Sequence, residues 1–188
     1  MIHPALDCVL DWRHDNPKAE VVRIVVRGNP LLGDRADRPD VSTGRESQVS
    51  VQHAAAVALL TGNAGLDEFS DARVRDPGVL ALRSKVELIR DPAFSTIAAA
   101  VEITTADGRI LHRSQGASRG SDANPMSDAA LEDKLRMAAA GWEPQHNVAM
   151  LIDAVWALDS SADVSRWRRG LSRGTDRVPS YGCRQVRL

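Results

Sequence analysis

Cysteine is almost absent from this chain of 188 residues, which contains only Cys8 and Cys183. Two cysteines so far apart form neither a disulfide framework nor the paired pattern of a structural zinc site. The five histidines are scattered as well and lack the short spacings that bind metal on a helix. There is no glycine-rich dinucleotide fingerprint and no phosphate-binding loop. We therefore expect a reducing, cytoplasmic location, no metal site and no cofactor.

Long apolar runs and an excess of charge are also missing. The longest apolar run is too short to span a bilayer. The first residues, MIHPALDCVL, lack the basic segment and long apolar core of a signal peptide. The formal net charge of −1 carries no general signature of binding to nucleic acid or to a membrane surface. We predict a globular cytoplasmic protein that binds neither.

The chain does contain a stretch made only of small and aliphatic residues, 54–60, with His53 directly before it. Alanine and leucine favour a helix, which Ser47 or Ser50 can cap and which Gly62 can end in the left-handed conformation. Because so many alanines let another backbone approach closely, we expect this helix to be buried. His53 lies in its first turn, where the helix dipole disfavours the imidazolium. A neutral histidine there is either a hydrogen-bonded structural residue or a proton acceptor.

Periodicity divides the rest of the chain into helices and strands. Further helices are predicted over 4–13, 66–69, 128–140 and 145–158, and one begins at Pro77. Strands are predicted over 20–27, 85–90, 97–105 and 109–115, the last two joined as a hairpin by Asp107-Gly108. The segments 29–45 and 116–125 are predicted to be loops. This order indicates an α+β fold, a small antiparallel-rich sheet with helices packed on it.

The last segment differs in composition from the rest. Residues 164–188 contain seven arginines and one acid, Asp176, with no sustained apolar period. Such a segment is either a basic arm for an acidic partner or a solvated tail. We predict one domain over 1–163 and a disordered arginine-rich tail over 164–188.

Five stretches, in order, resemble the MmgE/PrpD family, which includes 2-methylcitrate dehydratase, cis-aconitate decarboxylase and iminodisuccinate epimerase. The stretches are SVQHAAAVALLTG, GLDEFSDARVRDPGVLALRSKVELIRDP, VEITTADGRILHR, RGSDANPMSDAALEDKLR and LIDAVWALDSSADVS. The resemblance covers about 1–165 and concerns only the C-terminal part of the family. Full-length members begin with a large helical domain, over which the C-terminal α+β domain closes as a lid, and the active site lies between the two.

The resemblance implies the lid part of a cofactor-independent lyase that dehydrates or decarboxylates small di- or tricarboxylates. It also implies that activity requires a helical N-terminal partner domain. We expect a homodimer or a complex with a separately encoded helical domain. The alternative is a truncated, non-catalytic remnant or a dimerisation or interaction module.

Four residues are candidates for the site. His3, in IHPALDCVLDWR, looks like the catalytic histidine that opens a helix before the first strand of the lid domain. His53 stands where many members carry an active-site tyrosine, in a pattern similar to S-x-x-Y-A-V-A-x-A-L-L-x-G, and is a candidate substrate contact. Arg45 and Arg119, in the two predicted loops, are candidates for binding substrate carboxylates because guanidinium matches their shape. The alternative for both arginines is an ordinary solvated charge.

Overall fold

The computed structural model describes residues 2–139 and 148–160. The chain divides into two compact units, Met1–Met126 and Ser127–Leu188. The arginine-rich tail predicted over 164–188, and the boundary predicted before it, lie outside the described residues.

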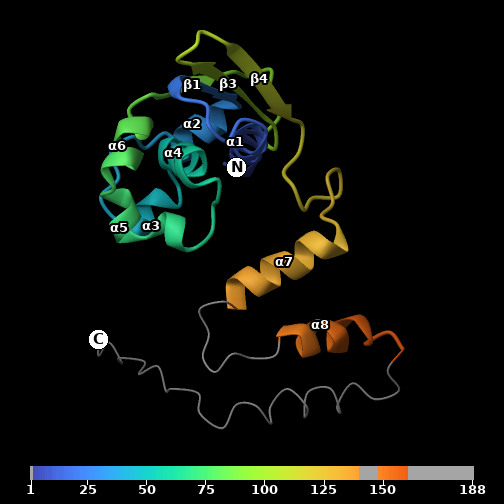
Figure 1. Cartoon of the computed structure of the whole chain (residues 1–188). Helices are drawn as coiled ribbons and strands as arrows, with labels where there is room; N and C mark the ends of the chain where they lie inside the picture. Colours follow the sequence, from blue (N-terminus) through green and yellow to red (C-terminus); the bar gives the residue numbers. More distant parts are fainter. Residues whose placement is uncertain (1, 140–147, 161–188) are drawn as a thin grey trace, which may run out of the picture. The chain divides into compact units, whose positions relative to one another are not determined.

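The first unit is built on a four-stranded sheet in the order β2-β1-β3-β4 (Figure 1). Its strands are β1 (Val21–Gly28), β2 (Val86–Arg90), β3 (Ala99–Thr105) and β4 (Ile110–Gln115). β3 is antiparallel to both β1 and β4, while β1 and β2 are parallel. The α+β prediction is therefore confirmed, and the parallel pair follows from the helices that connect β1 to β2.

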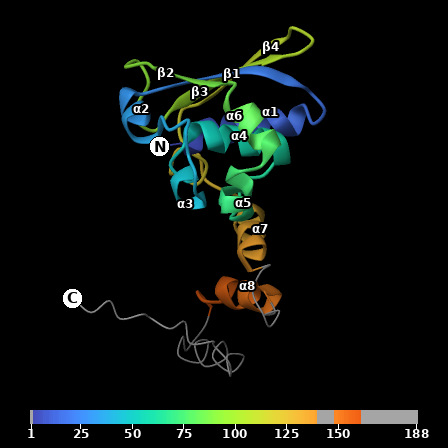
Figure 2. The same ribbon diagram turned by 90° about the vertical axis from the view of Figure 1, so that its left-hand side faces the viewer.

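Helices α1 (His3–Asp15) and α4 (Val51–Thr61) pack on one face of this sheet (Figures 1 and 2). The inner side of α1 carries Val9 and Trp12, both fully buried, and this core continues into Ile24 and Val101 of the sheet. Pro4 in the first turn of α1 suits a position whose N–H would have no helical partner. Burying side chains of this size contributes about 2 kcal/mol each, so α1 is firmly seated.

α4 is the buried helix that the alanine-rich stretch predicts. Ser50 caps it by accepting a hydrogen bond from the backbone N–H of His53, and Gly62 ends it at φ 74°. Its two faces contact different neighbours. Val51 and Ala55 belong to the core shared with α1, whereas Ala56 and Val57 pack against α6 (Pro77–Arg83).

The prediction of an unstructured loop over 29–45 is wrong, because this segment forms α2 (Pro30–Ala36) and the start of α3 (Gly44–Ser47). The Asn29 side chain accepts a hydrogen bond from the Leu31 N–H and so caps α2. Leu32 and Ala36, four residues apart, place one face of α2 in the core. The remaining short elements are η1 (Asp67–Phe69) and α5 (Asp71–Val74).

The second unit contains α7 (Asp128–Ala139) and α8 (Val148–Trp156). The indole N–H of Trp156 donates a hydrogen bond to the Glu132 carboxylate at 2.9 Å. No residue of α7 is buried, and Ile152 is the buried residue of α8. None of the helices within 2–139 and 148–160 is long and apolar enough to cross a membrane.

Candidate functional site

His3 is the first residue of α1, and its side chain is exposed. The positions one, two and three turns further along the same side of the helix are Asp7, Asp11 and Asp15. This side of α1 therefore presents one imidazole followed by three carboxylates.

The three carboxylates attach α1 to β4 and to the loop that follows it. Asp15 pairs with the Arg113 guanidinium at 2.9 Å, and Asp11 accepts from the Gln115 side-chain amide at 3.3 Å. Asp7 accepts from the backbone N–H of Arg119 at 2.9 Å. We call these three contacts the polar ladder. Its last contact fixes the backbone of Arg119 one turn from His3.

The polar ladder thus brings together two of the four predicted site residues. His3 supplies an exposed imidazole, and Arg119 supplies an exposed guanidinium from a loop held against the same helix. We call His3, Asp7 and Arg119 the His3 site. An imidazole can donate or accept a proton, and a guanidinium can bind a carboxylate through two parallel hydrogen bonds.

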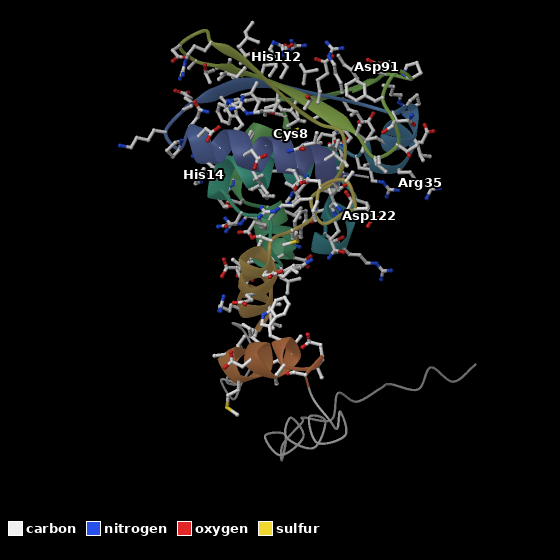
Figure 3. All side chains as sticks on the ribbon, turned by 90° about the vertical axis from the view of Figure 1, so that its right-hand side faces the viewer. Cys8, His14, Arg35, Asp91, His112 and Asp122 are labelled. Carbon is white, nitrogen blue, oxygen red and sulfur yellow. The ribbon has the colours of Figure 1, made fainter. Side chains whose placement is uncertain are left out.

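Helix α2 lies at the end of α1 where His3 begins it (Figures 2 and 3). Figure 3 shows His14 toward one end of α1 and Arg35 and Asp122 toward the other, which is the end where His3 begins the helix. In Figure 2 the start of α1 is on the same side of the unit as α2 and α3. Arg45, in α3, is exposed and has no ion-pair partner among the residues that the structure describes. Its role in binding a carboxylate stays a prediction.

His53 has a different environment, because its side chain is 0% exposed. Its ring Nε2 lies 2.9 Å from the carbonyl oxygen of Glu68, and since a carbonyl only accepts, Nε2 carries the proton. The ring also packs on Phe69, with the ring centroids 5.6 Å apart. Nδ1 is buried and has no hydrogen-bond partner within the described part of the chain. Desolvation by this burial lowers the pKa of His53, partly offset by the Glu68 carbonyl, so the ring is neutral near pH 7.

The structure does not bring His53 and His3 together. At 100° per residue, His53 lies on the side of α4 that carries Ala56 and Val57, opposite the side that packs against α1. The contacts of His53 with Glu68 and Phe69 hold η1 against α4, so they stabilise the fold. Its role as a substrate contact stays a prediction, and it would require the imidazole to become uncovered.

Cys8 lies behind the polar ladder on the inner side of α1. Burial, together with Asp11 and Asp7 nearby, raises the pKa of this thiol to about 12. A thiol with such a pKa is a poor nucleophile at neutral pH. Within 2–139 and 148–160, no group of three or more histidine, cysteine or acidic side chains could hold a metal ion.

Two hollows of the first unit lie away from the His3 site. The larger, about 490 Å³, is lined by the segment after α1 and the β3–β4 turn, including Lys18 and Arg109. The smaller, about 140 Å³, lies on the sheet over Arg27 and Glu102. Neither hollow is lined by His3 or Arg119, and both of these side chains are exposed.

Some features of this region are missed when the sequence is read without the fold. The spacing His3, Asp7, Asp11, Asp15 is visible in the sequence and would have indicated one polar side of α1. Nothing local to Arg119 indicates that its backbone is held by Asp7, because the two residues are 112 positions apart.

Comparison with known proteins adds two findings. The profile of the MmgE/PrpD C-terminal domain matches residues 1–160. The cis-aconitate decarboxylase of Homo sapiens is 29% identical over 153 residues, covering 79% of this chain and 31% of that relative. The chain therefore spans about a third of the length of the curated relative that it matches.

Proposed function

Because the chain belongs to the MmgE/PrpD family through its C-terminal domain, we propose that it forms the lid part of the active site of a cofactor-independent lyase acting on small di- or tricarboxylates. The observation that carries the proposal is the His3 site. There an exposed imidazole begins a well-seated helix, beside a loop that is anchored to the same helix and carries an exposed arginine.

Decarboxylation of an unsaturated tricarboxylate is the first candidate reaction, because the human relative is named cis-aconitate decarboxylase. In this reaction a proton is added to a carbon of the double bond, and the electrons of the broken carbon–carboxylate bond re-form a double bond as CO2 leaves. Imidazole is suited to supply the proton near neutral pH. In our proposal His3 is this donor, and Arg119 binds a carboxylate that is retained.

Dehydration is the second candidate reaction of the same site. A base removes a proton next to a carboxylate, and an acid assists departure of the hydroxyl as water. In our proposal His3 can take either role, because a neutral imidazole acts as a base and a protonated one acts as an acid. The groups that select one reaction would come largely from the surface that faces this lid.

We further propose that a helical domain outside these 188 residues completes the site. The outward position of His3 and Arg119 supports this part of the proposal, because a reaction of charged carboxylates gains most when water is excluded. An exposed imidazole at the edge of a lid becomes enclosed only when another surface closes over it.

A non-catalytic interaction module is the rival function, and the second unit supports it. Leu131 and Met137 of α7 are 47% and 69% exposed, and Trp156 of α8 is 50% exposed. Exposed apolar side chains on two neighbouring helices are available to pack against another protein. An interaction module would bind such a partner without catalysing turnover.

One set of assays separates these functions. The chain is incubated with cis-aconitate and with 2-methylcitrate, alone and together with a helical domain of the family, and CO2 release and dehydration are followed. The lyase proposal expects turnover in the mixture and its loss in His3→Ala. Binding of the helical domain with no turnover of either substrate, or of related acids, supports the interaction module instead.

A further inference from the structure

Arg38, in the segment between α2 and α3, is held by two buried side chains of α4. The Gln52 carbonyl oxygen accepts a hydrogen bond from the Arg38 N–H at 3.1 Å. The Ser50 hydroxyl donates to the Arg38 carbonyl oxygen at 2.6 Å. Ser50 is 0% exposed and Gln52 is 2% exposed. Both polar groups of the Arg38 backbone are therefore fixed by the interior of the unit.

Gln52 also binds the carboxylate of Asp37, the residue before Arg38. The Gln52 amide nitrogen donates to Asp37 at 2.7 Å. Burying an amide and a hydroxyl destabilises a fold by about 1–3 kcal/mol for each group left without a partner, and here the partners belong to the segment 37–38. The Asp37 carboxylate is thus engaged by a buried donor rather than by the adjacent guanidinium.

The rest of the segment is restrained as well. Pro39 follows Arg38 and restricts the backbone of both residues. Arg83 of α6 donates to the Val41 carbonyl oxygen at 3.3 Å. A long side chain on a fixed backbone loses less conformational freedom when it binds a ligand, and this favours affinity.

The Arg38 guanidinium is exposed and has no ion-pair partner among the described side chains. Arg35, three residues earlier, is also exposed and without an ion-pair partner among the described side chains. It lies at the end of α1 where His3 begins the helix (Figure 3). A cation that is fixed at its backbone, free at its head group and three residues from Arg35 differs from an ordinary solvated arginine.

We propose that Arg38 binds a carboxylate of the substrate and thereby selects di- and tricarboxylates over monocarboxylates. This inference rests on the proposed function, since it assigns a substrate contact to the same lid. Arg119 and Arg38 then approach the substrate from the loop after β4 and from the segment after α2. Two separate guanidinium groups require two separate carboxylates, which is the source of the selection.

Titration of the full chain with cis-aconitate, followed by NMR of the backbone amides, tests the inference. Arg38→Gln removes the charge and leaves the backbone contacts with Ser50 and Gln52 in place. We expect about tenfold weaker binding of cis-aconitate, because one pair of charge-assisted hydrogen bonds is lost. Lys18→Gln is the matched control, because it removes the same charge at the other end of α1, and its affinity is expected to stay within about twofold of wild type.

A second variant tests the part played by the fixed backbone. Gln52→Leu keeps the Arg38 guanidinium but removes the buried side-chain contacts to the Arg38 N–H and to Asp37, while the N–H keeps its bond to the Ala36 carbonyl oxygen. Weaker binding of about threefold is expected. Equal affinity of Arg38→Gln and wild type, equal losses in Arg38→Gln and Lys18→Gln, or no binding by the wild-type chain would each overturn the inference. These results would not contradict the proposed reaction, because that reaction is tested separately, by measuring turnover and its loss in His3→Ala.

Discussion

Replacing His53 distinguishes a structural histidine from one that faces the substrate. The side chain is 0% exposed, so His53→Ala removes a buried ring and leaves a cavity. It also leaves the Glu68 carbonyl, now bonded at 2.9 Å, without its donor. The cavity and the unsatisfied carbonyl together predict a loss of about 3 kcal/mol in the free energy of unfolding.

His53→Phe isolates the hydrogen bond from the packing. Phenylalanine fills most of the volume and keeps the contact with Phe69, but it cannot donate to Glu68. It also removes the buried Nδ1, which lacks a partner in the described part of the chain. We therefore expect a smaller loss of about 1 kcal/mol.

Urea unfolding at neutral pH measures both effects. His14→Ala is the matched control, because His14 is an exposed histidine on α1 and its loss should change stability by less than about 0.5 kcal/mol. The reasoning is refuted if His53→Ala is as mild as His14→Ala, since a fully enclosed ring cannot be removed without a large loss.

The pH dependence of stability gives an independent check on the same residue. Burial lowers the pKa of His53 in the folded protein, whereas in the unfolded chain a histidine has a pKa of about 6.5. Below about pH 6.5 the unfolded chain therefore takes up a proton that the folded protein does not. The contribution of the neutral His53 to the free energy of unfolding is therefore complete above that pH. It is lost as the pH falls toward the folded-state pKa, by at most about 1.4 kcal/mol per pH unit. The difference between wild type and His53→Phe should show this slope, and a flat difference would contradict it.

Other predictions concern single contacts elsewhere in the first unit. Asp7→Asn weakens the charge-assisted bond to the Arg119 N–H, so amide hydrogen exchange in the loop after β4 should accelerate about threefold to tenfold while the unfolding free energy changes by less than about 1 kcal/mol. Gly44→Ala places a methyl carbon 2.3 Å from the Phe69 carbonyl oxygen, so thermal unfolding should show a loss of about 1–3 kcal/mol, and an unchanged Tm would contradict this close approach. Cys8 has a pKa raised to about 12 and is buried, so alkylation of the native protein at pH 8 should be far slower than in urea, and equal rates would show that the thiol is accessible.

The features predicted correctly from the sequence are those set by neighbours in the chain. Asp107-Gly108 lies in the loop that closes the β3–β4 hairpin, with Gly108 at φ 82°, so the hairpin that Asp-Gly predicts is confirmed. The same holds for α4, whose start and end follow from Ser50 and Gly62. Each of these signals acts over a few residues, so no knowledge of the fold is needed to interpret it.

The features that were missed, or left open between two readings, depend on distant partners. α2 lies among charged residues, and its helix is favoured because Leu32 and Ala36 reach the core. The burial of His53 depends on Glu68 and Phe69, which lie in an element that folds back over α4. Residue type and spacing indicate what such a side chain could do, and only the tertiary structure decides whether it is accessible.

The most direct test of the proposed lid compares two histidines at the two ends of α1. His3→Gln and His14→Gln are each combined with a helical domain of the family, and release of CO2 from cis-aconitate is measured. The proposal predicts that His14→Gln retains wild-type turnover and that His3→Gln loses at least about a hundredfold, as expected for removal of a general acid. Equal turnover of the two variants would contradict the assignment of His3 as the proton donor.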